Sequence, residues 1–401
     1  MSKTNTAGNS LAGKFKNMNK ASKNNMLTLS LVILFFVIFK IITTVGSSES
    51  LIGIFPMICY YIILAVSLNL VVGFLGELSL GHAAFMCVGA FSSGMFSKIF
   101  ADTISNDWLR FLLAVVVGTL VGGIVGILVG SLVLRLRGDY LAVVTLAFGE
   151  VIRSLLNNLY IVFNDGKLKV SFIENTVTEG VSVENVIIKG ATGMTKLVSV
   201  YKDFHRNNTF IILGMILVVV TLLIVFNFIN SRSGRAVMAI RDNRIAAEAS
   251  GINITKYRLM IYGLSSALAG MAGVLYIHFL GMAEPVSFDY NFSIEILVIV
   301  VLGGIGSIRG SIIAAAILTW LPTSSLFMNF DKYRMLIYSI VLIVMMLFTW
   351  NPKCKEILKK LSVKNLILKI FKKKKETVEE TVEVESKTAE TVVETADKEV
   401  Q

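Results

Sequence analysis

Two residues of opposite charge lie inside a long apolar stretch of the sequence. Glu150 follows Asp139 by about three helical turns, which places it near the middle of a predicted membrane span, and Arg153 follows on the same helix face. An ionised side chain at that depth is costly unless it faces the protein interior or water. We therefore consider two roles for this pair, a self-neutralising clamp between helices and part of the lining of a transport path.

Glycines interrupt two apolar segments, one in each half of the chain: GFLGELSLGHAAF (73–85) and LGGIGSIRGSIIAAA (302–316). Glycine permits unwound backbone, and it also permits close helix packing, which is the simpler explanation. A pair of such segments typically marks a translocation site built from inverted repeats, where unwound N–H groups can meet a substrate carboxylate. The candidate contacts are Ser79, Gly81, His82, Gly303, Gly304 and Gly306.

A third segment, SRSGRAVMAIRDNRIAAEASGINITKYR (231–258), is basic and rich in alanine. Its pattern predicts a helix that is capped by Ser231 or Ser233 and ends at Gly251. Such a helix is too polar to span a membrane and too short to be stable alone. It therefore suits docking into a groove of a soluble partner, with a helix lying on the membrane surface as the alternative.

The composition indicates that these segments lie in a lipid bilayer. Of 401 residues, 55% are hydrophobic and 16% are charged, against about a quarter charged in soluble domains. The sequence predicts an all-α polytopic membrane protein with about ten transmembrane helices, because a span needs about 20 apolar residues. The predicted spans are 26–45, 52–74, 80–100, 110–134, 139–160, 209–230, 257–279, 291–308, 310–328 and 333–350.

Positive charge predicts the orientation of the chain. Lysines and arginines gather in the N-terminal tail (1–25), after the fourth predicted span, in the 231–256 loop and after the tenth span. Ten spans place all four regions on one side, which is the cytoplasm, so both termini are expected inside. The expected organisation is a transmembrane domain (26–350) with an extracellular segment (161–208) that carries short strands near 181–188, followed by a disordered tail (351–401).

Several kinds of chemistry are not expected from this sequence. The net charge of +11 gathers beside predicted spans, which argues for membrane lipid and against nucleic acid as the partner. No phosphate-binding G-x-x-x-x-G-K-[ST] loop occurs, so ATP would have to be hydrolysed by another subunit. We expect no catalytic residue, cofactor or metal site. Glu77, His82 and Glu295 are weaker site candidates, and His278 is expected to be structural.

Six segments resemble the M-type (LivM) permease of branched-chain amino acid ABC importers, and together they cover about residues 52–350. They are NLVVGFLGELSLGHAAFMCVGAF (69–91), LRGDYLAVVTLAFGEVIRSLLNN (136–158), AIRDNRIAAEASGI (239–252), AGMAGVLY (269–276), EPVSFDYNFSIEIL (284–297) and VLGGIGSIRGSIIAAAIL (301–318).

The resemblance implies a bacterial cell-membrane importer for Leu, Ile and Val. It would contain this chain, a second permease (LivH-type), two ATPase subunits and an extracellular substrate-binding protein. The resemblance also implies that the 231–256 loop docks the ATPase. The coupling residues would be Arg241, Asp242, Ala247, Glu248 and Gly251.

Two points stay open at this stage. About 30 residues (159–188) look inserted relative to the family pattern, which leaves the docking of the binding protein undefined. Related permeases for urea or another small polar solute share the GxLSLGH segment, and a stand-alone secondary transporter would also have broken helices and buried charges. A structural scaffold fits least well, because it leaves those two features without a purpose.

Overall fold

The computed structural model describes residues 20–46, 49–133, 136, 138–164, 167–173, 186–201, 204, 209–323, 339–340 and 343. By internal contacts the chain divides into residues 1–329 and 330–401, and the fold below is that of the first unit. The predicted C-terminal tail, residues 1–19 of the predicted N-terminal tail and most of the predicted tenth span therefore lie outside the described residues, whereas residues 20–25 of that N-terminal tail already belong to a helix.

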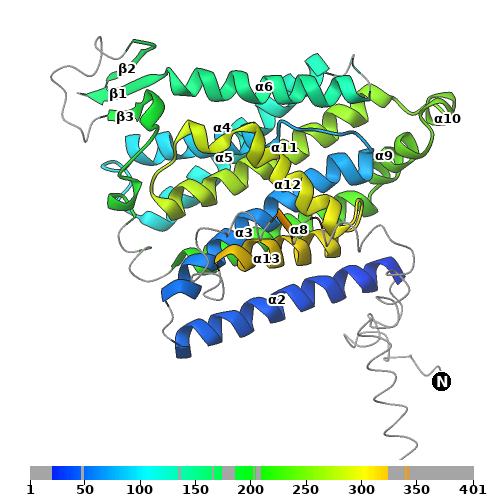
Figure 1. The fold of residues 1–401 in the computed structure, drawn as a ribbon, viewed down its shortest axis with the longest axis horizontal. Coiled ribbons are helices and arrows are strands. Elements are labelled where there is room, and N and C mark those ends of the chain that lie inside the picture. The colour runs from blue at the N-terminus through cyan, green and yellow to red at the C-terminus, as the bar shows by residue number, and fades with distance from the viewer. Residues whose placement is uncertain are drawn as a thin grey trace, which may run out of the picture. The chain divides into compact units, whose positions relative to one another are not determined.

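The first unit is a bundle of helices with a small sheet (Figure 1). Its α-helices are α2 (Lys20–Gly46), α3 (Glu49–Asn69), α4 (His82–Ile99), α5 (Asp107–Val133), α6 (Asp139–Asn157), α8 (Thr209–Asn230), α9 (Arg232–Asp242), α10 (Arg244–Ala249), α11 (Ile254–Leu280), α12 (Tyr290–Gly303) and α13 (Ile308–Thr323). A π-helical turn, η2 (Leu70–Leu75), extends α3.

The prediction of a polytopic helical membrane protein is confirmed. Five helices of the described part are long and apolar enough to cross a bilayer: 53–75, 107–132, 140–157, 209–230 and 254–280. Shorter apolar helices occupy 25–40, 290–303 and 308–321. The predicted span 209–230 coincides with α8, whereas α6 ends before the predicted residue 160 because the chain enters a strand there.

Glycines bring α4, α5 and α11 into close contact at the centre of the bundle. A Cβ atom added to Gly270 of α11 would lie 2.6 Å from the carbonyl oxygen of Gly118 on α5. One added to Gly122 would lie 3.1 Å from the Cα of Gly270, and Gly89 of α4 faces Gly270 from the other side. This glycine seam, with small residues four apart on α5, is the packing that replaces hydrophobic burial in membranes.

The two ends of the bundle carry different segments, separated by the length of α11. This helix has 27 residues and is therefore about 40 Å long. Its first turns contact Glu77, and residues 231–253 and 304–307 lie at the same end, which we call the loop end. Residues 194–200 and 281–289 meet beyond its last turn, next to the sheet, and we call this the sheet end (Figure 1).

The sheet has three antiparallel strands in the order β2-β1-β3, namely β2 (Lys167–Ser171), β1 (Tyr160–Asn164) and β3 (Val186–Lys189). Residues 186–188 of the strand predicted near 181–188 lie in β3, whereas residues 181–185 lie outside the described residues. Lys98 of α4 donates to the carbonyl of Val186 at 3.2 Å, which joins the sheet to the bundle.

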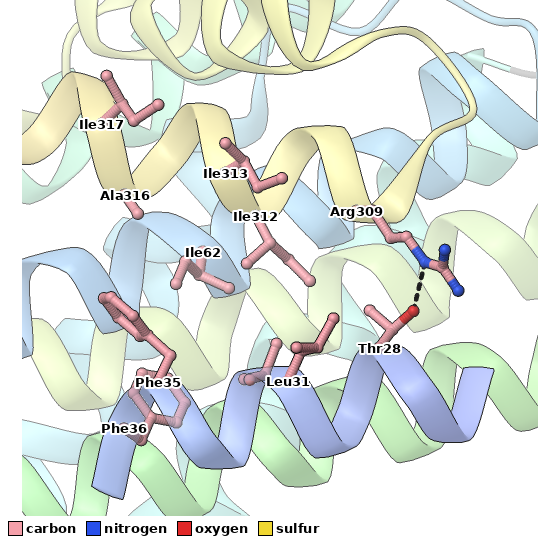
Figure 2. A pocket seen from close by; sticks show the side chains of 11 residues that line it. Thr28, Leu31, Phe35, Phe36, Ile62, Arg309, Ile312, Ile313, Ala316 and Ile317 are labelled. Carbon is pink, nitrogen blue, oxygen red and sulfur yellow. Dashed lines mark hydrogen bonds between the residues drawn. The ribbon is translucent and has the colours of Figure 1, made fainter. Parts of the chain in front are cut away.

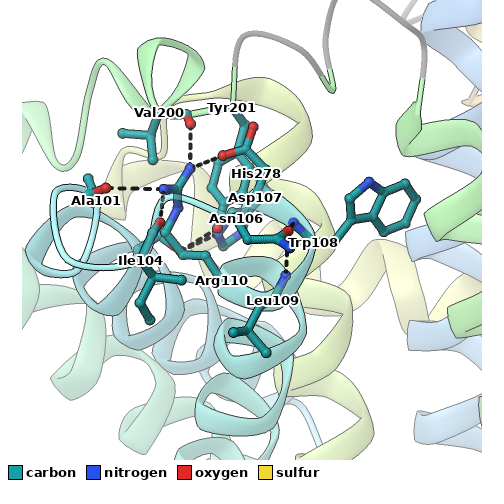
Figure 3. A network of polar contacts seen from close by, with 11 residues as sticks. Ala101, Ile104, Asn106, Asp107, Trp108, Leu109, Arg110, Val200, Tyr201 and His278 are labelled. Atoms are coloured by element: carbon teal, nitrogen blue, oxygen red, sulfur yellow. Dashed lines mark hydrogen bonds and ion pairs between the residues drawn. The ribbon is translucent and has the colours of Figure 1, made fainter.

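A buried arginine fastens the sheet end (Figure 3). Arg110 at the start of α5 donates to the carbonyls of Ile104 (2.8 Å) and Val200 (2.6 Å), pairs with Asp107, and lies over the Tyr201 ring. One guanidinium therefore holds residues 101–107 and 197–201 in place through charge-assisted hydrogen bonds.

The Tyr201 hydroxyl continues this network to α11. The ring nitrogen Nδ1 of His278 must donate to the carbonyl of Val274 (2.8 Å), so its Nε2 accepts from Ser97, which in turn accepts from Tyr201. Burial raises the pKa of the Tyr201 phenol, which keeps it protonated and able to donate. The expectation that His278 is structural is confirmed, because both ring nitrogens have partners.

We predict that Gly270→Ala destabilises the bundle, because the new methyl group would collide with backbone of α5 rather than with a movable side chain. Overpacking of this kind costs about 1–3 kcal/mol. The thermal unfolding temperature of the purified protein in detergent measures the effect. Gly53→Ala in α3 is the matched control, since its Cβ would meet nothing within 4 Å. Equal stability of the two variants would contradict the seam.

Candidate translocation and coupling site

The first glycine-broken segment turns back into the bundle. The π-helical turn ends at Gly76, whose φ of 79° is left-handed, and residues 77–81 lie outside any helix before α4 begins at His82. The Nε2 atom of His82 contacts the Ser67 hydroxyl at 2.7 Å, two helical turns before the end of η2. The N-terminus of α4 is therefore inside the bundle, about 12 Å from its loop end.

Hydroxyl side chains from two other helices satisfy the unwound backbone. The N–H of Leu80 donates to Thr145 of α6, and the N–H of Ala83 donates to Ser293 of α12, each at 3.1 Å. The Ser67 hydroxyl donates to the Leu64 carbonyl, so Nε2 of His82 must be the donor in their contact. The break is thus a packed junction of α3, α4, α6 and α12.

The three predicted contacts in this break are all buried. Ser79 is 2% exposed, and among the described residues its hydroxyl has no hydrogen-bond partner. A Cβ on Gly81 would collide with the carbonyl of Thr145, so a larger residue would push α6 away. His82 is enclosed and packs edge-on against Phe85. Contact with a substrate therefore requires this junction to open.

The second break meets the first. Residues 304–307 separate α12 from α13, with Gly304 (φ 95°) and Gly306 (φ 81°) in conformations that favour glycine. The N–H of Gly306 donates to Oδ1 of Asn69 at 2.8 Å, and Nδ2 of Asn69 donates to Ser311 at 2.8 Å. A Cβ on Gly73 would lie 2.7 Å from the Cα of Gly306. Asn69 therefore clamps the two breaks together.

The cytoplasmic loop predicted from the sequence reaches this junction. Nη1 of Arg241, in α9, donates to the carbonyl oxygen of Gly73 at 2.9 Å, while Nη2 pairs with Asp242 at 3.0 Å. The Arg241 side chain also lies against Gly76, whose Cβ would be 2.7 Å from its Cγ. Arg241 and the two glycine breaks, predicted as separate features, therefore form one hydrogen-bonded site.

The prediction of a single helix in this loop is wrong. Ser231 caps α9, its hydroxyl accepting from the N–H of Gly234 at 3.1 Å, but α9 ends at Asp242. Asn243 has extended backbone (φ −156°) and its side chain caps a second helix, α10, by accepting from Ala246 at 3.0 Å. The loop therefore turns at Asn243, which places α10 on a separate axis from α9 (Figure 1).

The short helix α10 offers an apolar contact that the sequence analysis missed. Ile245 is 81% exposed, whereas Ala247 on the same helix is buried and Glu248 is exposed. Gly251 then ends the turn with a left-handed φ of 82° and open space around it. The sequence could have indicated this contact, because Ile245 stands among basic and small residues. Exposed apolar side chains at helix surfaces often serve as anchors for a partner protein.

A second ion pair fixes the first break to α11. Nε of Arg258 lies 2.6 Å from Oε1 of Glu77, and the Tyr262 hydroxyl donates to Oε2 at 3.3 Å. Arg258 is buried, so this charge is compensated inside the protein. The sequence analysis ranked Glu77 as a weak candidate, and its long-range partner in α11 gives it a structural role in the break.

The Glu150–Arg153 pair forms as the spacing predicts, with Nη2 and Oε2 2.7 Å apart. Both residues belong to α6, so the pair forms within one helix, and its two predicted roles, a clamp between helices and part of the path lining, stay predictions. Both side chains remain 31% exposed, on a helix whose neighbours Val151 and Leu155 are also exposed. A second half-buried carboxylate, Glu295 of α12, accepts from the Tyr61 hydroxyl at 3.2 Å.

Known permease proteins resemble this chain in sequence. The sequence model of a family described as "Branched-chain amino acid transport system / permease component" matches residues 50–346. The high-affinity branched-chain amino acid transport system permease proteins LivM of Salmonella typhimurium and Escherichia coli K12 are each 33% identical over 309 residues, which is 76% of this chain and 70% of theirs.

More distant similarity covers less of the chain. The ribose import permease protein RbsC of Escherichia coli is 30% identical over 130 residues, or 31% of this chain and 40% of its own length. No solved structure matches this chain. Because the family model spans most of the sequence and the LivM proteins align over two thirds of their own length, the chain belongs to the family of permease components of branched-chain amino acid transport systems.

Proposed function

We propose that this chain forms, with a second permease, the path by which an ATP-driven importer carries leucine, isoleucine and valine across the bacterial cell membrane. The observation that carries the proposal is the junction at Asn69, where two interrupted helices and Arg241 of the 231–253 loop are hydrogen-bonded together. In an ATP-driven importer the translocation path has to be connected to the segment that contacts the ATPase. This junction connects the two glycine breaks to the 231–253 loop directly.

The substrate class follows from the LivM relatives and from the chemistry of the break. An amino acid in transit needs a partner for its α-carboxylate, and the N-terminus of α4 supplies a positive dipole end within the bundle. Ser79 adds a buried hydroxyl whose hydrogen bond is unused among the described residues. Opening the junction would present Ser79, Gly81 and His82 together with residues 303–306, while apolar walls accept a branched side chain.

A second permease is supported by charges on the outer face of the chain. The Glu150–Arg153 pair and Glu295 lie in apolar helices and remain partly exposed. Charges at this depth face protein or water rather than lipid. We propose that the LivH-type partner covers the faces of α6 and α12 that carry them, so that the path runs between the two permeases.

Coupling to ATP would act through α10 and Arg241. Two ATPase subunits would dock on the loop end, with Ile245 as the apolar anchor and the buried Ala247 setting the position of α10. A displacement of α9 would then pull on the Gly73 carbonyl through Arg241. We propose that the loop end is cytoplasmic, that both termini lie inside, and that the sheet end faces an extracellular substrate-binding protein.

We predict that cells lacking this gene lose uptake of labelled leucine and that the restored gene recovers it. Leucine uptake should be lost on ATP depletion, because ATP hydrolysis by separate ATPase subunits would power the transport. Uptake that survives ATP depletion would point to a stand-alone secondary transporter. Unchanged leucine uptake after deletion, in a strain without a second leucine system, would reject the substrate, and urea would be tested next.

We predict that Ser79→Ala reduces leucine uptake about tenfold while the protein stays folded. Removing a buried hydroxyl without a partner is neutral or stabilising for folding, whereas losing a hydrogen bond to a carboxylate costs about 1.5–3 kcal/mol. Uptake and thermal stability are measured side by side. Ser93→Ala is the control, since that buried hydroxyl donates to its own helix at 2.9 Å. Normal uptake by the Ser79 variant would remove Ser79 from the path.

We predict that Arg241→Ala uncouples ATP hydrolysis from transport. The ATPase subunits should still co-purify, because Ile245 is unchanged, but uptake per ATP hydrolysed should fall about tenfold with loss of the bond to Gly73. Arg235→Ala is the matched control, since Arg235 lies in the same helix and donates to the nearby carbonyl of Asn230 at 2.9 Å. The coupling role fails if both variants keep a normal ratio of uptake to hydrolysis.

A further inference from the structure

The sheet carries exposed apolar side chains although it lies outside every candidate span. They are between 45% and 65% exposed and belong to Leu168, Val170, Phe172 and Ile173. Apolar side chains exposed on the helices need no special explanation, because lipid can cover them, and the rim of the slot between α2 and α13 is of that kind (Figure 2). The same exposure in the sheet would face water unless a partner or a lipid surface covers it.

The end of α6 and the strand register place these side chains relative to the bilayer. The α6 span, 140–157, is about 27 Å long, close to the thickness of the hydrocarbon core, so it ends near the edge of that core. The N–H of Leu159 still donates to the carbonyl of Leu156, which continues the last helical turn up to β1. Tyr160 therefore lies about 5 Å beyond the end of the span.

The second strand brings the chain back to this level. β2 runs antiparallel to β1 and ends with Ser171 opposite Tyr160, beside the end of α6 (Figure 1). Phe172 and Ile173 follow directly, and the N–H of Ile173 donates to the Ser171 hydroxyl at 3.0 Å, which keeps the turn compact. Both residues therefore lie within the headgroup layer, which adds about 5–8 Å to each side of the core.

Apolar and charged residues are ordered along the hairpin. Val170 is one residue farther from the bilayer than Ser171, and Lys169 is two residues farther, about 7 Å. The far end pairs Asn164 with Lys167, and both lysines are exposed. A protein that approached from the water would meet this polar end first. A lipid surface instead meets the apolar end, with Lys169 above it at the level of the phosphates.

We propose that Phe172 and Ile173 insert into the interfacial layer of the bilayer beside the end of α6. Val170 would lie at the upper edge of the inserted part, and Lys169 would contact the phosphate of an anionic phospholipid. The proposal gives a role to the residues that look inserted relative to the family pattern, 159–188, which the sequence analysis left open. It depends neither on the substrate carried nor on which leaflet the sheet end meets.

This contact would hold the strand that the bundle does not hold. β1 continues from α6, and β3 is tied to α4 by the bond from Lys98 to the carbonyl of Val186. β2 is the edge strand on the other side of β1, with which alone it pairs among the described strands. A lipid contact at its end would therefore fix the orientation of the sheet over the sheet end of the bundle.

Electron paramagnetic resonance of a spin label in the complete importer, reconstituted in phosphatidylglycerol liposomes, tests the proposal. The label is attached to Phe172→Cys or Leu168→Cys after the accessible native cysteines of the complex have been replaced. Oxygen concentrates in the acyl layer, so the ratio of its collisions to those of a water-soluble nickel complex should be several times higher at residue 172. Leu168 is the matched control, since it is a half-exposed apolar residue of the same strand about 13 Å farther out. Both variants should assemble, because neither side chain is buried.

Equal collision ratios at the two positions would overturn the proposal, because both side chains would then stand in water. A label at residue 172 that is shielded from oxygen and nickel alike would also overturn it, since protein would cover the site. Repeating the measurement without the substrate-binding protein would show whether that protein is the cover. In phosphatidylcholine liposomes the label should lie less deep, and Lys169→Gln should abolish this difference between lipids. A depth that is the same in both lipids would refute the contact of Lys169 with an anionic headgroup.

Discussion

A backbone N–H or C=O group inside a membrane must find its partner within the protein, because the hydrocarbon offers none. The two glycine breaks free several such groups, and the structure satisfies them with side chains from distant elements. Asn69 serves Gly306, Thr145 serves Leu80, and Arg241 serves Gly73. Each of these hydrogen bonds joins two elements. The need to satisfy the backbone of an interrupted helix therefore produces the junction at which α3, α4, α6, α9, α12 and α13 meet.

This junction and the glycine seam have opposite mechanical properties. In the seam, backbone packs on backbone through Gly118, Gly122 and Gly270, and no rotamer change can relieve a displacement. At the junction the elements are held by a few hydrogen bonds, each worth about 0.5–1.5 kcal/mol, or somewhat more where Arg241 donates. The α4–α5–α11 core is therefore expected to move as one body, with relative motion concentrated where the breaks and the 231–253 loop meet.

The parts of this arrangement that the sequence predicts are local ones. Glycine spacing predicts both breaks, and three-residue spacing predicts the Glu150–Arg153 pair. Serines before a polar helix predict a cap at Ser231 or Ser233, and Ser231 forms it. The contacts that assemble the site are long-range and follow from no local pattern, as Asn69 and Gly306 are 237 residues apart. The loop was predicted as one helix because its composition is helical throughout, whereas Asn243 both ends α9 and caps α10.

The charged residues of the chain fall into two groups, those that are buried and paired and those that remain partly exposed. Where the chain keeps a charge for its own architecture, it buries the arginine and pairs it with an acid: Arg110 reaches backbone carbonyls and Asp107, and Arg258 meets Glu77. The Glu150–Arg153 pair has the same chemistry but stays partly open on α6. Since lipid cannot solvate it, its remaining capacity for hydrogen bonds must be met by a second protein or by water. The face of α6 that carries this pair is therefore the face at which a second protein or water has to complete the hydrogen bonding of a charge.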